Sequence, residues 1–64
     1  RTHEALVQLR RAYTLQKDAE IAAHLGEVLW VQGQKDEARK YFDESRKIDP
    51  ENRSLLRALQ KTGA

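Results

Sequence analysis

The sequence predicts an all-α protein made of antiparallel helix hairpins, with about four helices in total. Apolar residues recur at three- and four-residue spacing in four successive segments, and a Gly or a Pro stands close to the end of three of them. The composition agrees, because 39% apolar and 34% charged residues with one Pro and three Gly are typical of a folded, helix-rich chain. The 64 residues amount to one small domain or a piece of a larger one.

The first two helices are predicted over residues 2–15 and 18–32. The first carries an apolar stripe made of Ala5, Leu6, Leu9, Ala12 and Tyr13. Asp18 is suited to begin the second helix, because Asp side chains accept hydrogen bonds from the free amides of a first turn. Gly33 follows the second helix as a natural terminator. The apolar stripe of this helix consists of Ile21, Ala22, Leu25, Val28 and Leu29.

The third helix, predicted over residues 35–48, is apolar on one side and densely charged elsewhere. Its apolar side holds Ala38, Tyr41, Phe42, Ser45 and Ile48. The run Asp49-Pro50-Glu51-Asn52 ends this helix, because a proline ring cannot continue the hydrogen-bond ladder. A fourth helix that stops near Gly63 is then defined by Leu55, Leu56 and Leu59.

The chain repeats itself at an interval of 33 to 34 residues. The first and third helices match at an offset of 33, in the pairs Ala5 with Ala38, Leu9 with Phe42, and Ala12 with Ser45. The second and fourth helices match at an offset of 34, in the pairs Ile21 with Leu55, Ala22 with Leu56, and Leu25 with Leu59. The difference of one residue falls in the linkers, where insertions are tolerated.

Small, large and helix-breaking residues in the second and third helices follow one spacing, namely Ala22, Leu25, Gly26, Leu29, Gly33, Ala38, Phe42 and Pro50. This pattern resembles the signature of the tetratricopeptide repeat, a helical hairpin of about 34 residues. Ala22 stands where the family prefers Trp, Leu29 where it prefers Tyr, and Ser45 where it prefers Ala. All three are substitutions of packing residues, so the resemblance holds.

The resemblance implies a division of the chain into three parts. Residues 1–17 are expected to be the second helix of a preceding repeat, residues 18–52 one complete repeat, and residues 53–64 a C-terminal capping helix. Gln60 stands where another repeat would carry Gly, which favours the C-terminal end of a repeat array. Residues 22–30 are also similar to repeats of bacterial envelope proteins that serve as assembly or protease adaptors.

Each residue type in the signature has a packing role. Gly26 and Ala38 are small where the paired helices are expected to cross closely, and Phe42 fills the space between layers. Gly33 permits a tight turn between the paired helices, and Pro50 ends the second of them. The signature therefore predicts a packed scaffold and does not indicate which ligand the scaffold binds.

The resemblance implies a noncatalytic scaffold for protein–protein interaction. In such arrays the first helices of successive repeats line a concave surface, which binds a peptide or protein segment, and neighbouring repeats stack on each other. The candidate partner-binding residues lie off the core stripe of the second helix and on the matching strip of the fourth. They are Glu20, Ala23, Glu27, Trp30, Val31, Arg57 and Lys61, with His24 in the same arc.

Trp30 allows two interpretations. Trp is enriched among the residues that dominate binding energy at interfaces, so Trp30 could be an exposed anchor for a partner. It could equally be a structural plug that packs against the fourth helix near Leu55 or Leu59. The sequence alone leaves both open.

Two other functions also remain open at this point. The helices could act only as a structural cap that shields the last apolar face of a repeat array from water. Residues 20–26 also look like the first helix and turn of a helix-turn-helix DNA-binding domain. The DNA-binding interpretation needs a turn at Gly26 and a polar recognition helix, whereas Val28, Leu29 and Trp30 continue the apolar period and would read bases poorly.

No catalytic residue, cofactor or metal site is predicted. The chain has no Cys, and neither its His nor its Ser residues stand in a triad context. Glu20, His24 and Glu27 share one helix face, but carboxylate bundles that bind metal use the opposite order, Glu-x-x-His, with further ligands from facing helices. No apolar run approaches the roughly 20 residues that a membrane span needs, so membrane insertion is not expected.

The expected partners are a protein or peptide and neighbouring repeats. The net charge of +2 does not favour any one class of partner, and binding to nucleic acid is not predicted. Because repeats bury their cores only by stacking, the first helix is expected to lack a packing partner and the fragment to self-associate through it. The compartment stays open between the cytoplasm and the bacterial periplasm or envelope.

Overall fold

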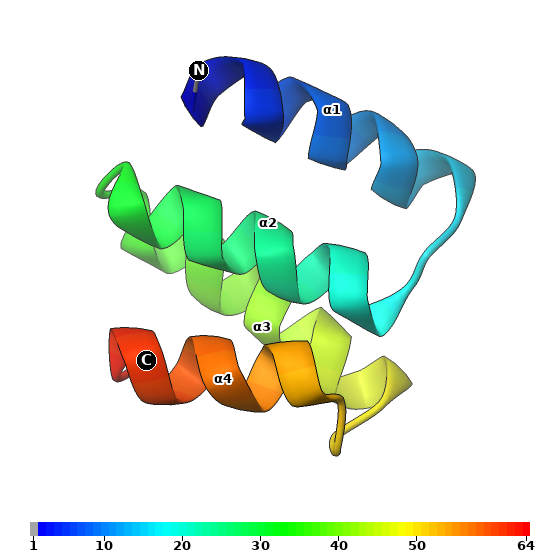
Figure 1. Ribbon diagram of the computed structural model, residues 1–64, viewed down its shortest axis with the longest axis vertical. Coiled ribbons are helices and arrows are strands. Elements are labelled where there is room, and N and C mark those ends of the chain that lie inside the picture. The colour runs from blue at the N-terminus through cyan, green and yellow to red at the C-terminus, as the bar shows by residue number, and fades with distance from the viewer. Residues whose placement is uncertain (1) are drawn as a thin grey trace.

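The computed structural model describes residues 2–64, with side chains from His3 onward. It contains four helices, α1 (Thr2–Leu15), α2 (Ala19–Val31), α3 (Lys35–Ile48) and α4 (Arg53–Thr62), and no strand among the described residues. The prediction of an all-α protein with four helices is confirmed. Figure 1 shows α2 in the middle of the molecule, with α1 on one side of it, α4 on the other, and α3 behind.

Polar side chains cap the starts of α2 and α4. Asp18 Oδ1 accepts a hydrogen bond from the amide of Glu20 at 2.8 Å, which confirms the predicted cap of α2. Asn52 Oδ1 accepts from the amide of Leu55 at 3.1 Å and caps α4 in the same way. These contacts satisfy amides that have no partner within a first helical turn.

The turn between α2 and α3 depends on Gly33. Its φ of 88° lies in the left-handed region, where a side chain would be strained. The amide of Gly33 donates to the Trp30 carbonyl at 3.0 Å, and the amide of Gln34 donates to the Leu29 carbonyl at 2.9 Å. This pair of hydrogen bonds is the Schellman arrangement that ends a helix, so the predicted role of Gly33 is confirmed.

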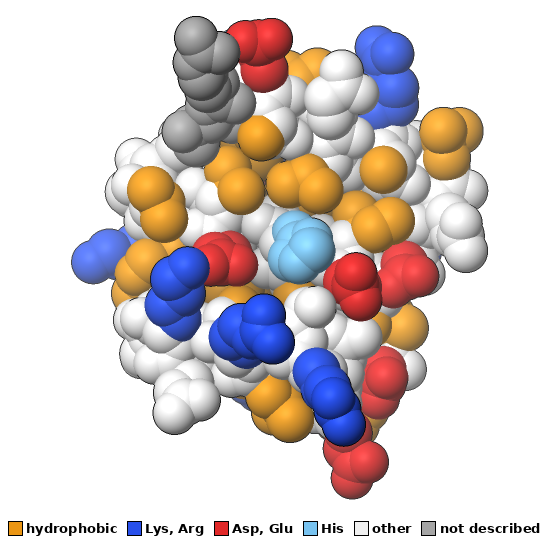
Figure 2. All heavy atoms as spheres, viewed as in Figure 1, with side chains coloured by type: hydrophobic (Ala, Val, Ile, Leu, Met, Phe, Trp, Pro, Cys, Tyr) orange, Lys and Arg blue, Asp and Glu red, His pale blue; other side chains and the backbone are white. Residues whose placement is uncertain are grey.

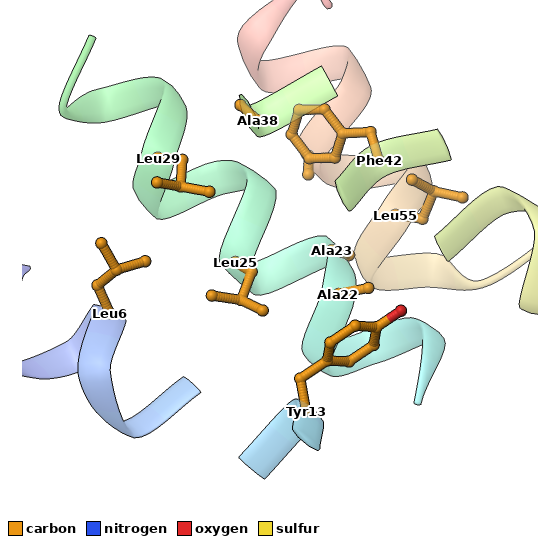
Figure 3. Packing of buried hydrophobic residues seen from close by; sticks show 10 residues of the cluster. Leu6, Tyr13, Ala22, Ala23, Leu25, Leu29, Ala38, Phe42 and Leu55 are labelled. Atoms are coloured by element: carbon orange, nitrogen blue, oxygen red, sulfur yellow. The ribbon is translucent and has the colours of Figure 1, made fainter. Parts of the chain in front are cut away.

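The core is formed where α2 packs against the other three helices. Its buried apolar side chains come from all four helices: Leu6, Tyr13, Ala19, Ala22, Ala23, Leu25, Leu29, Ala38, Phe42, Leu55 and Ala58. Figure 3 shows Leu6 of α1 and Leu25 of α2 facing each other across one interface, and Phe42 of α3 filling the space on the other side of α2. Helix α2 is therefore the central helix of the fold, and α1, α3 and α4 all pack against it.

The crossing of α2 and α3 is closest at Gly26. A Cβ atom at this position would lie 2.5 Å from Cε1 of Phe42, so only glycine lets the ring approach the helix this closely. One turn further along the interface, the Ser45 hydroxyl donates a buried hydrogen bond to the Ala19 carbonyl at 2.7 Å. The packing roles predicted for Gly26 and Phe42 are confirmed.

Besides the small Ala5, two large apolar residues of the predicted stripes lie outside the core. Ile48 is 46% exposed at the end of α3, and Leu56 is 50% exposed on α4. Both lie at the margins of the packed interfaces, where no helix among the described residues covers them. The inclusion of these two residues in the core stripes was wrong, because three- and four-residue spacing does not reveal where a neighbouring helix ends.

Side chains of α1 also reach α3 across the molecule. Arg10 donates to Glu37 at 2.8 Å in a half-exposed ion pair. The Tyr13 hydroxyl donates to Glu44 Oε1 at 2.6 Å, and its ring meets that of Tyr41 edge to face at 5.8 Å. These contacts fix the position of α1 relative to α3.

The Tyr13 hydroxyl makes stability depend on pH in the alkaline range. Burial, together with the hydrogen bond to Glu44, raises the pKa of Tyr13 from 10.0 to about 12. Because the pKa is higher in the folded chain, this contribution to stability is complete below pH 10 and is lost as pH rises towards 12. We expect the free energy of unfolding to fall over that interval, and to fall less in Tyr13→Phe.

A Tyr41→Phe variant leaves Tyr13 as the single tyrosine, so its ionisation can be followed directly by tyrosinate absorbance. A titration midpoint near 12 is expected in the folded chain. A midpoint near 10 in a chain that remains helical would contradict the contact with Glu44.

Candidate functional site

The free surface of α2 is a narrow strip, because α2 packs against all three other helices. Three residues of this strip are exposed, namely Glu20, His24 and Val31, the last to 73%. Glu27 lies beside them and is partly buried. The predicted positions of Glu20 and Val31 on an exposed arc of the second helix therefore agree with the structure.

Ala23 is a correction to the predicted site. It is fully buried, so it cannot contact a partner. Glu27, which lies one helical turn after Ala23, pairs with Lys61 of α4. This side of α2 therefore faces α4. The predicted arc was too wide, because a helix that contacts three neighbours exposes less than half of its circumference.

An ion pair joins α2 to α4 across the predicted concave surface. Lys61 Nζ lies 2.9 Å from Glu27 Oε2, and the two side chains are 69% and 29% exposed. The structure thus brings together two of the predicted partner-binding residues. Because Glu27 already has a cationic partner, its charge is less accessible to a ligand than that of Glu20.

A row of basic side chains runs along α4 beside the α2 strip. Arg53, Arg57 and Lys61 are spaced four residues apart, so they line one face of the helix, and all three are exposed. Figure 2 shows this blue row over α4, below the histidine that lies over α2. Arg53 was missed in the sequence analysis, although its spacing of four from Arg57 was the signal that could have found it.

Trp30 occupies a half-buried position between α2 and the start of α3. It packs against the core cluster. Lys35 Nζ lies 4.9 Å and Arg39 Cζ 5.4 Å from the centre of its ring, so two cations of α3 cover the indole. Much of the ring surface is therefore already engaged within the chain.

The helix-turn-helix interpretation is excluded by the course of α2. This helix continues from Ala19 to Val31 without a break at Gly26, where a DNA-binding motif of that type needs its turn. Gly26 is instead the contact point for Phe42.

Among the described residues there is no cluster of metal ligands, and the pocket between α3 and α4 is small and open. Within residues 3–64, His, Asp and Glu side chains form no group of three that could hold a metal ion. An open pocket of about 280 Å³ lies between α3 and α4, lined by Arg39, Phe42, Asp43, Arg46, Leu59 and Ala64. Ligand pockets usually span about 300 to 1,000 Å³ and enclose most of the ligand, so this depression is too small and open.

Among the described helices, none combines the length and the apolar character that crossing a membrane requires.

Antiparallel helix hairpins that stack so that each helix packs on its sequence neighbours define a helical-repeat protein. The family model described as tetratricopeptide repeat matches residues 19–52, which is more than half of the 64 residues and coincides with the α2–α3 hairpin. The chain belongs to the tetratricopeptide repeat family. Members of this family generally act as scaffolds for protein–protein interaction and not as enzymes. A search of curated proteins found no match, and neither did a search of solved structures.

Proposed function

We propose that the chain is a noncatalytic interaction scaffold that binds an acidic peptide segment along the surface shared by α2 and α4. The observation that carries this proposal is the exposed basic row of Arg53, Arg57 and Lys61 beside the free strip of α2. Of these three cations, only Lys61 forms an ion pair with another of the described side chains, those of residues 3–64. Two guanidinium groups are therefore free to meet carboxylates.

The spacing of the row fits an extended peptide. Side chains four residues apart on a helix lie about 6 Å apart along its axis. Alternate side chains of an extended strand lie about 6.6 Å apart and point the same way. A segment with a carboxylate at every second residue could therefore place successive carboxylates opposite successive cations of α4.

Binding of a synthetic extended peptide with Glu at alternate positions tests the proposal, with fluorescence anisotropy as the readout. Arg57→Glu is expected to weaken binding about fivefold to tenfold at low salt, because one attraction becomes a repulsion. Rising ionic strength should weaken the wild-type complex as well.

The matched control is Lys47→Glu, an exposed position on α3 that changes the net charge by the same amount. Its effect on affinity should be small. Equal losses for the two variants would show that only the overall charge matters and would contradict a binding surface on α2 and α4. No affinity difference between the Glu peptide and its Gln counterpart would contradict it too.

A structural cap is a second candidate, favoured by the outer side of α3. The residues of α1 that reach α3 are Arg10 and Tyr13, and the residues 33 positions later on α3 are Asp43 and Arg46. Both of these α3 residues are exposed, and they pair with each other at 3.8 Å. A terminal repeat needs such a polar outer face to remain soluble.

A further inference from the structure

Helices α2 and α4 lie side by side and run in the same direction (Figure 1). Their register is given by Glu27 and Lys61, whose charged atoms lie 2.9 Å apart. Because a helix rises about 1.5 Å per residue, the position of each exposed side chain along the two helices can be stated relative to this ion pair. The charges of α2 and α4 can therefore be compared at equal distances along the helix axes.

Glu20 is a free carboxylate on the α2 side of this surface. It is exposed and forms no ion pair with any described side chain, those of residues 3–64. It lies seven residues before Glu27 and on the same helix face, since seven residues make nearly two turns. Along the helix axis, Glu20 is thus about 10.5 Å from the ion pair. The strip of α2 therefore offers one free acidic group to a ligand.

Two free guanidinium groups lie on α4 to either side of this position. Arg57 lies four residues before Lys61 and Arg53 lies eight residues before it. Along the helix axis they are therefore about 6 Å and about 12 Å from the ion pair, and Glu20 falls between them. The surface thus presents a cation, an anion and a cation in turn, with the cations on α4 and the anion on α2.

An extended peptide can meet all three charges at once. Successive residues of a strand are about 3.3 Å apart and point to opposite sides. When two carboxylates, two residues apart, face Arg53 and Arg57, the residue between them points towards α2. This residue lies about 9 Å from the ion pair along the axis, which is within about 2 Å of the position of Glu20. A basic side chain there would meet the carboxylate of Glu20.

We propose that the preferred ligand is an extended peptide with an acidic–basic–acidic core, in which the basic residue pairs with Glu20. This preference rests on the acidic-peptide binding proposed above and adds a requirement for the residue between the two carboxylates. A carboxylate opposite Lys61 contributes less, because Glu27 already pairs with that cation. The core is the same when read in either direction, so it fits a peptide of either orientation.

Glu20 disfavours other residues at the central position of the peptide. A neutral residue leaves the Glu20 carboxylate without a partner, and a third acidic residue is repelled by it. The net charge of the chain, +2, would by itself favour the more acidic peptide. Pairing with Glu20 and attraction by net charge therefore predict opposite orders of affinity.

Fluorescence anisotropy with two synthetic peptides of equal composition tests the preference. One peptide has the core Glu-Lys-Glu and a Gln at one end, and in the other peptide this Lys and this Gln are exchanged. Length and net charge are then identical. We expect the peptide with Lys in the core to bind about twofold to fivefold more tightly, because one exposed ion pair is added.

Glu20→Gln should remove the difference between the two peptides, because the partner of the central Lys is lost. The ratio of two affinities measured on one variant does not depend on the fraction of the chain that is folded. The matched control is Glu4→Gln, which removes an exposed carboxylate from α1 and should keep the full difference.

The outcomes separate this preference from the proposed function. Equal affinities of the two peptides in the wild-type chain, with both weakened by Arg57→Glu, would overturn the preference and leave acidic-peptide binding in place. A difference that persists in Glu20→Gln would overturn the pairing with Glu20. If neither peptide binds, both the proposed function and the preference fail.

Discussion

Phe42→Ala is expected to remove about a third or more of the free energy of unfolding. The Phe42 side chain is 2% exposed and fills the space between α3 and Gly26 of α2. Truncation of a buried Phe costs about 3–5 kcal/mol, because both the burial and the surrounding contacts are lost. A chain of 64 residues is expected to have only about 3–10 kcal/mol in total. Urea unfolding followed by helical circular dichroism measures the loss.

Leu56→Ala is the matched control, since it also truncates a large apolar side chain of a helix but at a position that is 50% exposed. Its effect should stay below about 1 kcal/mol. Similar losses in the two variants would show that the crossing of α2 and α3 does not dominate stability.

Gly26→Ala approaches the same contact from the other helix. Alanine favours a helix over glycine by about 1 kcal/mol. Its Cβ atom would nevertheless meet a buried ring at 2.5 Å, and overpacking costs about 1–3 kcal/mol, so a net loss is expected. Phe42→Leu in the same chain should reduce that loss, because the two positions share one space and their effects are coupled.

Trp30→Ala is expected to lower stability by about 2 kcal/mol and to leave the affinity for the acidic peptide unchanged. The indole is half-buried against the core and covered by Lys35 and Arg39 of α3. Removal of the ring therefore loses apolar burial and two cation–π contacts, each about 0.5–1 kcal/mol. Thermal unfolding and peptide anisotropy, measured on the same variant, separate the two effects.

Trp30→Phe is the conservative control, because it keeps an aromatic ring under the two cations and should recover part of the lost stability. The opposite pattern, in which Trp30→Ala binds the peptide much more weakly but unfolds as the wild type does, would identify Trp30 as a binding anchor. We expect binding specificity to reside in the exposed residues around Trp30 instead.

The α2–α3 hairpin could be predicted well because its determinants are local. Asp18 caps a helix by contact with a residue two positions away, and Gly33 supplies a backbone conformation that other residues rarely adopt. The close crossing at Gly26 and Phe42 is a property of the repeat signature itself. These features depend on short spacings that a single sequence displays.

The site was harder to predict because it depends on which helices surround α2. Ala23 was placed on the exposed arc because it lies off the apolar stripe of its own helix, but it is fully buried in the structure. Trp30 was expected to contact α4 or a partner, whereas the residues found over its ring are on α3. Helical periodicity gives the angle between residues on one helix, and it does not give the number of neighbouring helices.

We propose that binding specificity resides on the exposed strip of α2 and the basic row of α4. The most direct measurement is a titration of the isotope-labelled chain with the alternating Glu peptide, followed by backbone amide NMR. We expect the largest shifts around Glu20, His24, Arg53 and Arg57. Shifts confined to α1 or to the outer side of α3, with no shifts on the surface of α2 and α4, would contradict binding at this surface.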